Sequence, residues 1–299
     1  MVGKKLTPSR VIFNIFNYGF FAIFTFLCAY PLWYVFIYSI SDPALTTSQT
    51  VVIWPIGLSL TNFQKVMELE GVFRALIMSV LRTVIGCVLC VLSCLLLGYL
   101  FTKDQMPFRK FMYRMLIVTM YIGGGLIPTY LVYKSYGLLN NFLIYVFPCV
   151  SAYYVILIKT YIESIPPSLE ESALIDGAGP LTIFWKIIAP LSIPIAATIA
   201  VYSAVGQWNA WFDNHIYTFQ EPKLMTLSYM LYTFLQQTEN LIEQLENTRD
   251  QAELNMAALL TPRGVRMTVT MVTVIPILCV YPFLQRYFIK GIMIGAVKG

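Results

Sequence analysis

The stretch that decides the fold is residues 73–101, which read FRALIMSVLRTVIGCVLCVLSCLLLGYLF. Its only charged residues are Arg74 and Arg82, both in its first half. A helix needs about 20 mostly apolar residues to cross a hydrocarbon core of about 30 Å. A helix that is apolar on every face is either deeply buried or spans a membrane. We therefore expect this stretch to form a transmembrane helix.

The composition of the whole chain supports a membrane protein. The 299 residues are 58% hydrophobic and 12% charged, whereas soluble domains are about 45–50% apolar and about 25% charged. The formal net charge is +5, but the basic residues are scattered at the ends of apolar runs and form no phosphate-binding face. This pattern is typical of membrane proteins and argues against a nucleic-acid partner.

Five further apolar runs are long enough to span a bilayer, which gives six expected transmembrane helices in one all-α domain covering residues 1–299. The six expected spans are residues 11–40, 73–101, 111–132, 138–158, 187–207 and 267–284. The first run is too long for the apolar core of a signal peptide, so we interpret it as an uncleaved helix.

The distribution of charge predicts the orientation, because cytoplasmic loops retain lysine and arginine. With the N-terminus inside, the inner side carries twelve basic and five acidic residues, and the outer side carries eight basic and ten acidic residues. Both termini are therefore expected in the cytoplasm, and residues 216–266 are expected to form a long extracellular loop. Arg82 lies about 31 Å from Lys103 along a helix, so we interpret it as an interfacial arginine that snorkels or is locally paired.

Residue types that often carry chemistry have ordinary explanations here. Cys87, Cys90 and Cys94 share one helical face but have no nearby histidine or acid, so we interpret them as packing residues. His215 is the only histidine. The chain has no phosphate-binding motif and no carboxylate relay within its apolar runs, so we expect no catalytic residue, no metal and no bound cofactor. Any energy source must come from another subunit.

The segment between the fourth and fifth apolar runs carries more information. Ser168 and Glu171 have the spacing of a capping box after two prolines, which predicts the start of a short helix. Gly177 can end that helix in the left-handed conformation, and Pro180 permits a second helix to start. The short helix carries carboxylates and no basic residue, so anionic lipid headgroups would repel it. A protein partner is the better expectation.

This segment resembles the signature of the membrane permease subunits of binding-protein-dependent ABC importers. The signature reads Glu-Ala-Ala, three residues, Gly, nine residues, Ile, one residue, Leu-Pro. The matching residues here are Glu171-Ser172-Ala173, Gly177, Ile187 and Ala189-Pro190, with the spacing kept throughout. Ser172 and Ala189 depart from the signature by small side chains.

Other stretches resemble the carbohydrate importers within that family. Asp176-Gly177-Ala178 has the form typical of them, and residues 208–212, WNAWF, resemble their Trp-Asn-x-Phe-Phe segment. Residues 124–130, 281–291 and 295–299 resemble a branch that handles complex plant-type oligosaccharides. The resemblance thus covers nearly the whole chain.

The resemblance implies a type I importer permease with a cytoplasmic coupling segment at residues 166–186 that docks on an ATPase subunit. The residues expected to couple to the ATPase are Glu170, Glu171, Ser172, Ala173, Asp176, Gly177, Ala178, Gly179, Ile187 and Pro190. The implied partners are a second permease subunit, giving a heterodimer, two ATPase subunits that use ATP and Mg²⁺, and an extracellular sugar-binding lipoprotein. The implied location is the bacterial cytoplasmic membrane.

Aromatic content of 15% suits sugar stacking, although aromatic residues also anchor helices at the bilayer interface. The candidates for contact with sugar are Trp208, Asn209, Trp211 and Phe212. Two alternatives remain open from the sequence. The chain could be an ABC permease for amino acids or peptides, since the signature is shared across importers, or it could be a channel or carrier that needs no ATPase.

Overall fold

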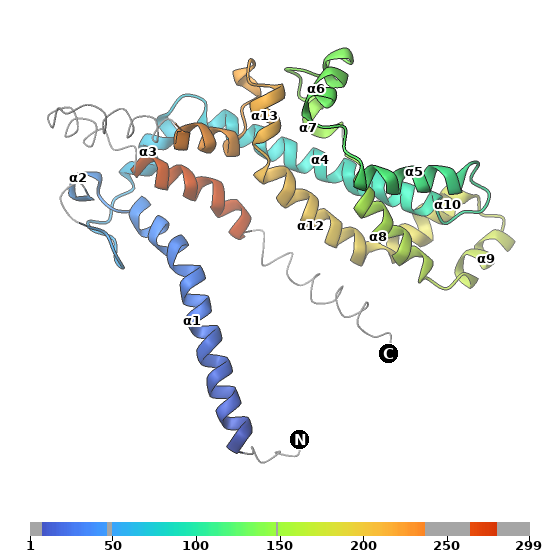
Figure 1. The fold of residues 1–299 in the computed structure, drawn as a ribbon, viewed down its shortest axis with the longest axis horizontal. Helices are drawn as coiled ribbons and strands as arrows, with labels where there is room; N and C mark the ends of the chain where they lie inside the picture. The colour runs from blue at the N-terminus through green and yellow to red at the C-terminus, as the bar shows by residue number, and fades with distance from the viewer. Residues whose placement is uncertain (1–7, 47–49, 148, 237–263, 280–299) are drawn as a thin grey trace. The chain divides into compact units, whose positions relative to one another are not determined.

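The computed structural model describes residues 8–46, 50–147, 149–236 and 264–279. In these residues the secondary structure is helical, and the only β-pairing is an isolated antiparallel bridge between Ser41 and Leu58. The chain divides into two compact units, residues 1–70 with 234–274 and residues 71–233 with 275–299. Figure 1 labels the helices from α1 to α13 with the exception of the short α11.

The first unit contains α1 (Pro8–Ser39), α2 (Pro43–Thr46) and α3 (Thr61–Glu68). Asn62 of α3 is buried and its amide donates to the carbonyl oxygens of Ser39 and Ser41, at 3.3 Å and 3.1 Å. Since a buried amide needs partners, these bonds fix α3 against the end of α1.

Most of α1 has no protein neighbour in this unit. Its buried residues are Ile37, Tyr38 and Ser39, all in the last turn, while the side chains before them are almost all exposed and largely apolar. Such a helix needs a nonpolar environment from lipid or a partner. It is one of two described helices that are long and apolar enough to cross a membrane by themselves.

The second unit is built around the other such helix, α4 (Val72–Leu100). Helices α8 (Ala152–Glu163) and α12 (Ile193–Asn209) pack along α4, and Figure 1 shows the three running side by side. Gly98 permits the close approach of α4 and α8, because a Cβ there would lie 2.5 Å from Cγ2 of Ile158.

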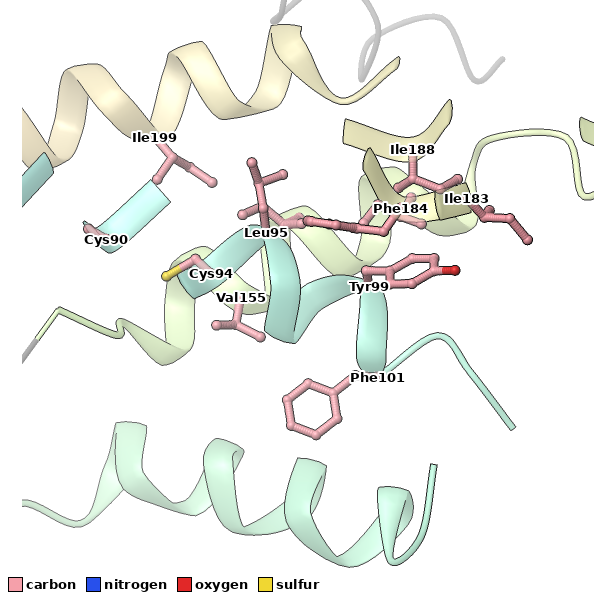
Figure 2. Close-up of a cluster of buried hydrophobic side chains, with 12 residues drawn as sticks. Cys90, Cys94, Leu95, Tyr99, Phe101, Val155, Ile183, Phe184, Ile188 and Ile199 are labelled. Carbon is pink, nitrogen blue, oxygen red and sulfur yellow. The ribbon is translucent and has the colours of Figure 1, made fainter. Parts of the chain in front are cut away.

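The core of this unit lies near the C-terminal end of α4. Figure 2 shows Leu95 and Tyr99 of α4 beside Phe184 and Ile188, which come from the segment before α12. The rings of Tyr99 and Phe184 have centroids 5.3 Å apart. Burial of such large apolar side chains contributes about 1.5–3 kcal/mol each. The core therefore anchors the segment that precedes α12.

Two of the expected spans are interrupted in the structure. The run at residues 111–132 forms α5 (Arg109–Tyr121) and α6 (Leu126–Ser135), separated at residues 122–125. Gly125 there has φ +77°, which lies outside the right-handed helical region and which glycine adopts at little cost, so the helix is interrupted at this point. The run at residues 138–158 likewise forms α7 (Leu143–Val146) and then α8 after a non-helical break.

The run at residues 187–207 is bent rather than straight. The chain passes from α10 (Pro180–Ile183) through a π-helix (Phe184–Ile188) and α11 (Ala189–Leu191) to α12, with a bend of 76° before α12. Pro190 and Pro194 flank Ser192, and each removes a backbone donor, which accounts for the break. A single span would have to include this bend.

The remaining elements follow α12. They are α13 (Phe212–Tyr217), a 3₁₀ turn (Pro222–Leu224), a helix over residues 227–236 and the helix Gly264–Cys279. The expected extracellular loop at residues 216–266 thus contains a helix that starts at residue 227. The acidic stretch Glu239–Glu253, the end of the expected sixth span and the C-terminal stretches of the resemblance lie outside the described residues.

Candidate functional site

The signature segment forms α9 (Ser168–Ile175), a short helix between two turns. Gly177 ends it with φ +78°. The N–H of Ala178 donates to the carbonyl of Ala173 at 2.9 Å, and the N–H of Gly177 donates to that of Leu174 at 3.0 Å. This pair of bonds is a Schellman motif. The expected left-handed glycine is therefore present.

The expected capping box is wrong. Pro167 is the N-cap residue, no side chain caps the helix, and Ser168 is already helical. The carbonyl of Pro167 accepts the N–H groups of Glu170 and Glu171 at 3.0 Å. The reason is that proline presets a helical φ, so the helix starts one residue earlier than the capping pattern indicates.

The structure separates two adjacent carboxylates that the sequence grouped together. Glu170 forms an ion pair with Lys103, which lies just beyond the end of α4, and both side chains are largely shielded, at 20% and 26% exposure. Glu171, the next residue along the helix, is exposed, and so is Asp176. Only Glu171 and Asp176 therefore remain open to a partner on this helix.

Exposed apolar side chains lie next to those carboxylates. Ile175 is 86% exposed, and Leu174, Leu181 and Trp185 are also more than half exposed. Surfaces that face water rarely leave such a cluster uncovered, and an apolar patch rimmed by polar or charged residues is typical of an interaction site. We call Glu171, Leu174, Ile175, Asp176 and Leu181 the α9 surface.

Several of the remaining signature residues pack against the protein core beneath this segment. Ala173 and Ala178 are partly buried against the core that contains Phe184. Ile187 lies in the π-helix and also packs on that core, whereas Pro190 lies in α11 and is exposed. These small and apolar residues support the segment. The carboxylates lie on its surface.

A cavity of about 270 Å³ lies in the second unit between α4, the start of α8 and α12. Much of its lining can form hydrogen bonds. The polar lining residues are Arg82, Ser151, Tyr154, Tyr202, Ser203 and Gln207. Hydroxyl, amide and guanidinium groups together with two tyrosine rings suit a polyhydroxylated ligand. The sequence singled out only Arg82 of this set, because the other residues come from separate runs.

Arg82 is one of the residues that line the cavity. Its Nε donates to Oε1 of Gln207 at 2.9 Å, and Nη1 donates to the carbonyl of Ala210 at 3.1 Å. The guanidinium also pairs with Asp213 and lies 4.5 Å from the centroid of the Tyr145 ring. Arg82 is therefore paired, but its partner is 131 residues away in sequence and the residue is buried, at 3% exposure, so it neither snorkels nor pairs locally as expected.

The four aromatic-segment candidates occupy different environments. Trp208 is only 8% exposed, and its carbonyl accepts the hydroxyl of Ser228 at 2.5 Å. Trp211 stacks on Tyr232 with centroids 4.0 Å apart. Asn209 and Phe212 are exposed. None of the four lines the 270 Å³ cavity.

A small aromatic group surrounds the stacked pair. His215 Nδ1 lies 3.4 Å from the hydroxyl of Tyr229, and the His215 ring meets the Tyr232 ring edge-on. Burial raises the pKa of Tyr229 above its ordinary value, so its hydroxyl stays neutral and can serve His215 as donor or acceptor. This group orders the chain after α12.

The helical secondary structure of the described residues, with two apolar helices long enough to span a membrane, indicates an integral membrane protein. No protein-family model matches the chain. Individual proteins do. The chain is 32% identical over 289 residues to the polygalacturonan/rhamnogalacturonan transport system permease protein YtcP of Bacillus subtilis, covering 96% of this chain and 99% of that protein. It is also 32% identical to protein LplC of the same organism, covering 98% and 97%.

A solved structure agrees with these relatives. The chain resembles a chain in the crystal structure of a bacterial ABC transporter involved in the import of the acidic polysaccharide alginate, with a TM-score of 0.83, 28% identity, and 95% and 99% of the two chains covered. The chain therefore belongs to the family of sugar and oligosaccharide ABC transporter permeases.

Proposed function

We propose that the chain is the transmembrane subunit of an ATP-binding-cassette importer that moves an oligosaccharide into the cell. The family membership carries this proposal, because a relative of nearly equal length is named as a polygalacturonan/rhamnogalacturonan transport system permease protein. The cavity lined by hydroxyl, amide and guanidinium groups supports it. No observation favours amino acids or peptides as the cargo.

The second part of the proposal concerns energy. The chain itself binds no nucleotide or Mg²⁺, and ATP is hydrolysed by two separate ATPase subunits, one of which docks on the α9 surface from the cytoplasm. The exposed Glu171 and Ile175 support this, since a carboxylate beside an apolar side chain matches a basic, partly apolar groove. Both termini are then cytoplasmic, as the charge distribution predicts.

The third part concerns the other partners. A second permease subunit completes the pathway as a heterodimer, and an extracellular sugar-binding lipoprotein delivers the oligosaccharide. The largely exposed α1 and its apolar side chains support a lipid or subunit contact along this helix. Residues 216–266 would face the binding protein.

The energy proposal is tested by reconstituting the subunits in vesicles and measuring ATP-driven uptake. Glu171→Lys should abolish capture of the ATPase and therefore uptake, because it places a cation against a basic groove. Glu163→Lys is the matched control, since Glu163 is an exposed carboxylate at the end of α8 and outside the α9 surface. Uptake by the permease without any ATPase would instead show a channel or carrier.

The cavity proposal is tested with two neighbouring tyrosines of α8. Tyr154 lines the cavity, whereas Tyr153 is exposed and does not. Tyr154→Ala should lower uptake of oligogalacturonide at a fixed ATPase rate, and Tyr153→Ala should not. Equal effects of the two changes would remove the cavity from the sugar pathway. A ligand screen on the binding protein that selects peptides would overturn the oligosaccharide assignment.

A further inference from the structure

Helix α9 is fastened to α4 at both of its ends. Near its start, Glu170 forms the ion pair with Lys103, three residues beyond the end of α4. Beyond its end, the hydroxyl of Tyr99 donates to the carbonyl of Pro180 at 3.2 Å. Since Pro180 begins α10, the whole α9 segment lies between two attachment points on a single helix end.

The two attachment points form one unit. The Lys103 ammonium lies 4.4 Å from the centroid of the Tyr99 ring, a cation–π contact. The Tyr99 ring is also buried and packs on Phe184. An ion pair with both side chains largely shielded is screened less by solvent and salt than a surface pair. These contacts therefore hold more firmly than an exposed lysine–glutamate pair would.

We propose that Tyr99 and Lys103 are positioning residues that make α4 follow α9 when the ATPase moves it. Helix α9 has no fully buried residue of its own, and Ala173 is its partly buried contact with the core. Without this attachment, a force on α9 would reach the rest of the unit through that small contact and through the chain connections on either side. With the attachment, the force enters α4 directly. This inference rests on the proposed docking of an ATPase at α9.

The rest of α4 is suited to carry that movement to the sugar cavity. The helix is continuous from Val72 to Leu100 and is packed closely against α8 at Gly98. Arg82 on the same helix lines the 270 Å³ cavity and donates to Gln207, which also lines it. A displacement at the C-terminal end of α4 is therefore transmitted along a stiff helix to Arg82, which lies about 27 Å from Leu100 along the helix axis.

The proposal assigns different roles to two adjacent glutamates, which allows a sharp test. Glu170 serves the internal attachment and Glu171 serves the ATPase. In the reconstituted complex, Lys103→Gln, Glu170→Gln and Tyr99→Phe should each retain ATPase capture and hydrolysis but lower the sugar imported per ATP by about fivefold, the factor expected for one net hydrogen bond. Glu171→Gln should weaken ATPase capture instead.

Two comparisons exclude a merely structural effect. Lys103→Arg, which keeps the charge, should restore the wild-type ratio of sugar to ATP. Lys159→Gln removes a similar lysine–glutamate pair, at 2.5 Å within α8, that does not touch α9, and it should leave the ratio unchanged. Wild-type ratios in the Lys103→Gln, Glu170→Gln and Tyr99→Phe variants would overturn the attachment. If the wild-type protein itself did not capture the ATPase, the proposed function would be overturned instead.

Discussion

Arg82 on α4 and Asp213 on α13 form a two-pronged ion pair across 131 residues of sequence. Nη1 lies 3.0 Å from Oδ1, and Nη2 contacts Oδ2. The arginine side chain is only 4% exposed, and that of Asp213 is 26% exposed. Because Gln207 and the Ala210 carbonyl accept the remaining bonds, this one guanidinium ties α4 to α12 and to the chain after it.

Removing the cation should be costly for stability. Arg82→Gln leaves Asp213 without its counter-charge in a largely buried place, which destabilises a protein by about 3 kcal/mol. Thermal unfolding in lipid nanodiscs measures the change. Arg74→Gln is the control, since Arg74 lies on the same helix but is exposed. Equal losses from both changes would contradict the structural role of the pair.

Close packing of α4 on α8 gives a second prediction. Gly98→Ala places a Cβ 2.5 Å from Ile158 Cγ2 and 3.2 Å from the backbone nitrogen of Lys159, so the helices must separate. Overpacking of this kind costs about 1–3 kcal/mol. The same stability measurement on Gly206→Ala in α12 should show no loss, because nothing lies within 4 Å there and alanine favours a helix.

The sequence predicts the elements whose signals are local. The apolar run at residues 73–101 corresponds closely to α4, and Gly177 ends α9 as expected. Local signals also misled: the Ser168–Glu171 spacing indicated a capping box, but the preceding prolines already supply the helix start. Hydropathy alone does not reveal breaks inside an apolar run, such as the bend before α12.

The candidate sites are formed by residues that are far apart in sequence, so no local sequence pattern reveals them. The sequence identified Glu170 and Glu171 as one acidic surface, yet only tertiary packing brings Lys103 to Glu170. Likewise, the cavity collects residues from α4, α8 and α12, so Tyr154 and Tyr202 could not be distinguished from interfacial tyrosines. The aromatic segment at residues 208–212 was conspicuous in the sequence, but the structure buries Trp208 in the protein and away from the cavity lining.

The left-handed glycine after α9 gives a third prediction. Gly177→Ala forces a side chain into the left-handed conformation at a cost of about 1–2 kcal/mol, which should loosen the last turn of α9. Amide hydrogen exchange at positions 177 and 178 of the variant should be about tenfold faster than in the wild-type protein, since both amides donate in the Schellman motif. Gly179→Ala is the control, because Gly179 has φ −72° and open space around it. Unchanged exchange in Gly177→Ala would contradict the motif.

Two residues of the aromatic segment, Trp208 and Phe212, give the last prediction, which compares the stability cost of removing a buried side chain with that of removing an exposed one. Trp208→Ala should destabilise the protein by about 3–5 kcal/mol, because it empties a buried indole site. Phe212→Ala should cost far less, since Phe212 is 48% exposed. Unfolding in nanodiscs measures both changes, and uptake by the reconstituted importer shows whether Phe212 contacts sugar. If Trp208→Ala left stability intact and lowered uptake alone, Trp208 would be a pathway residue and not part of the core.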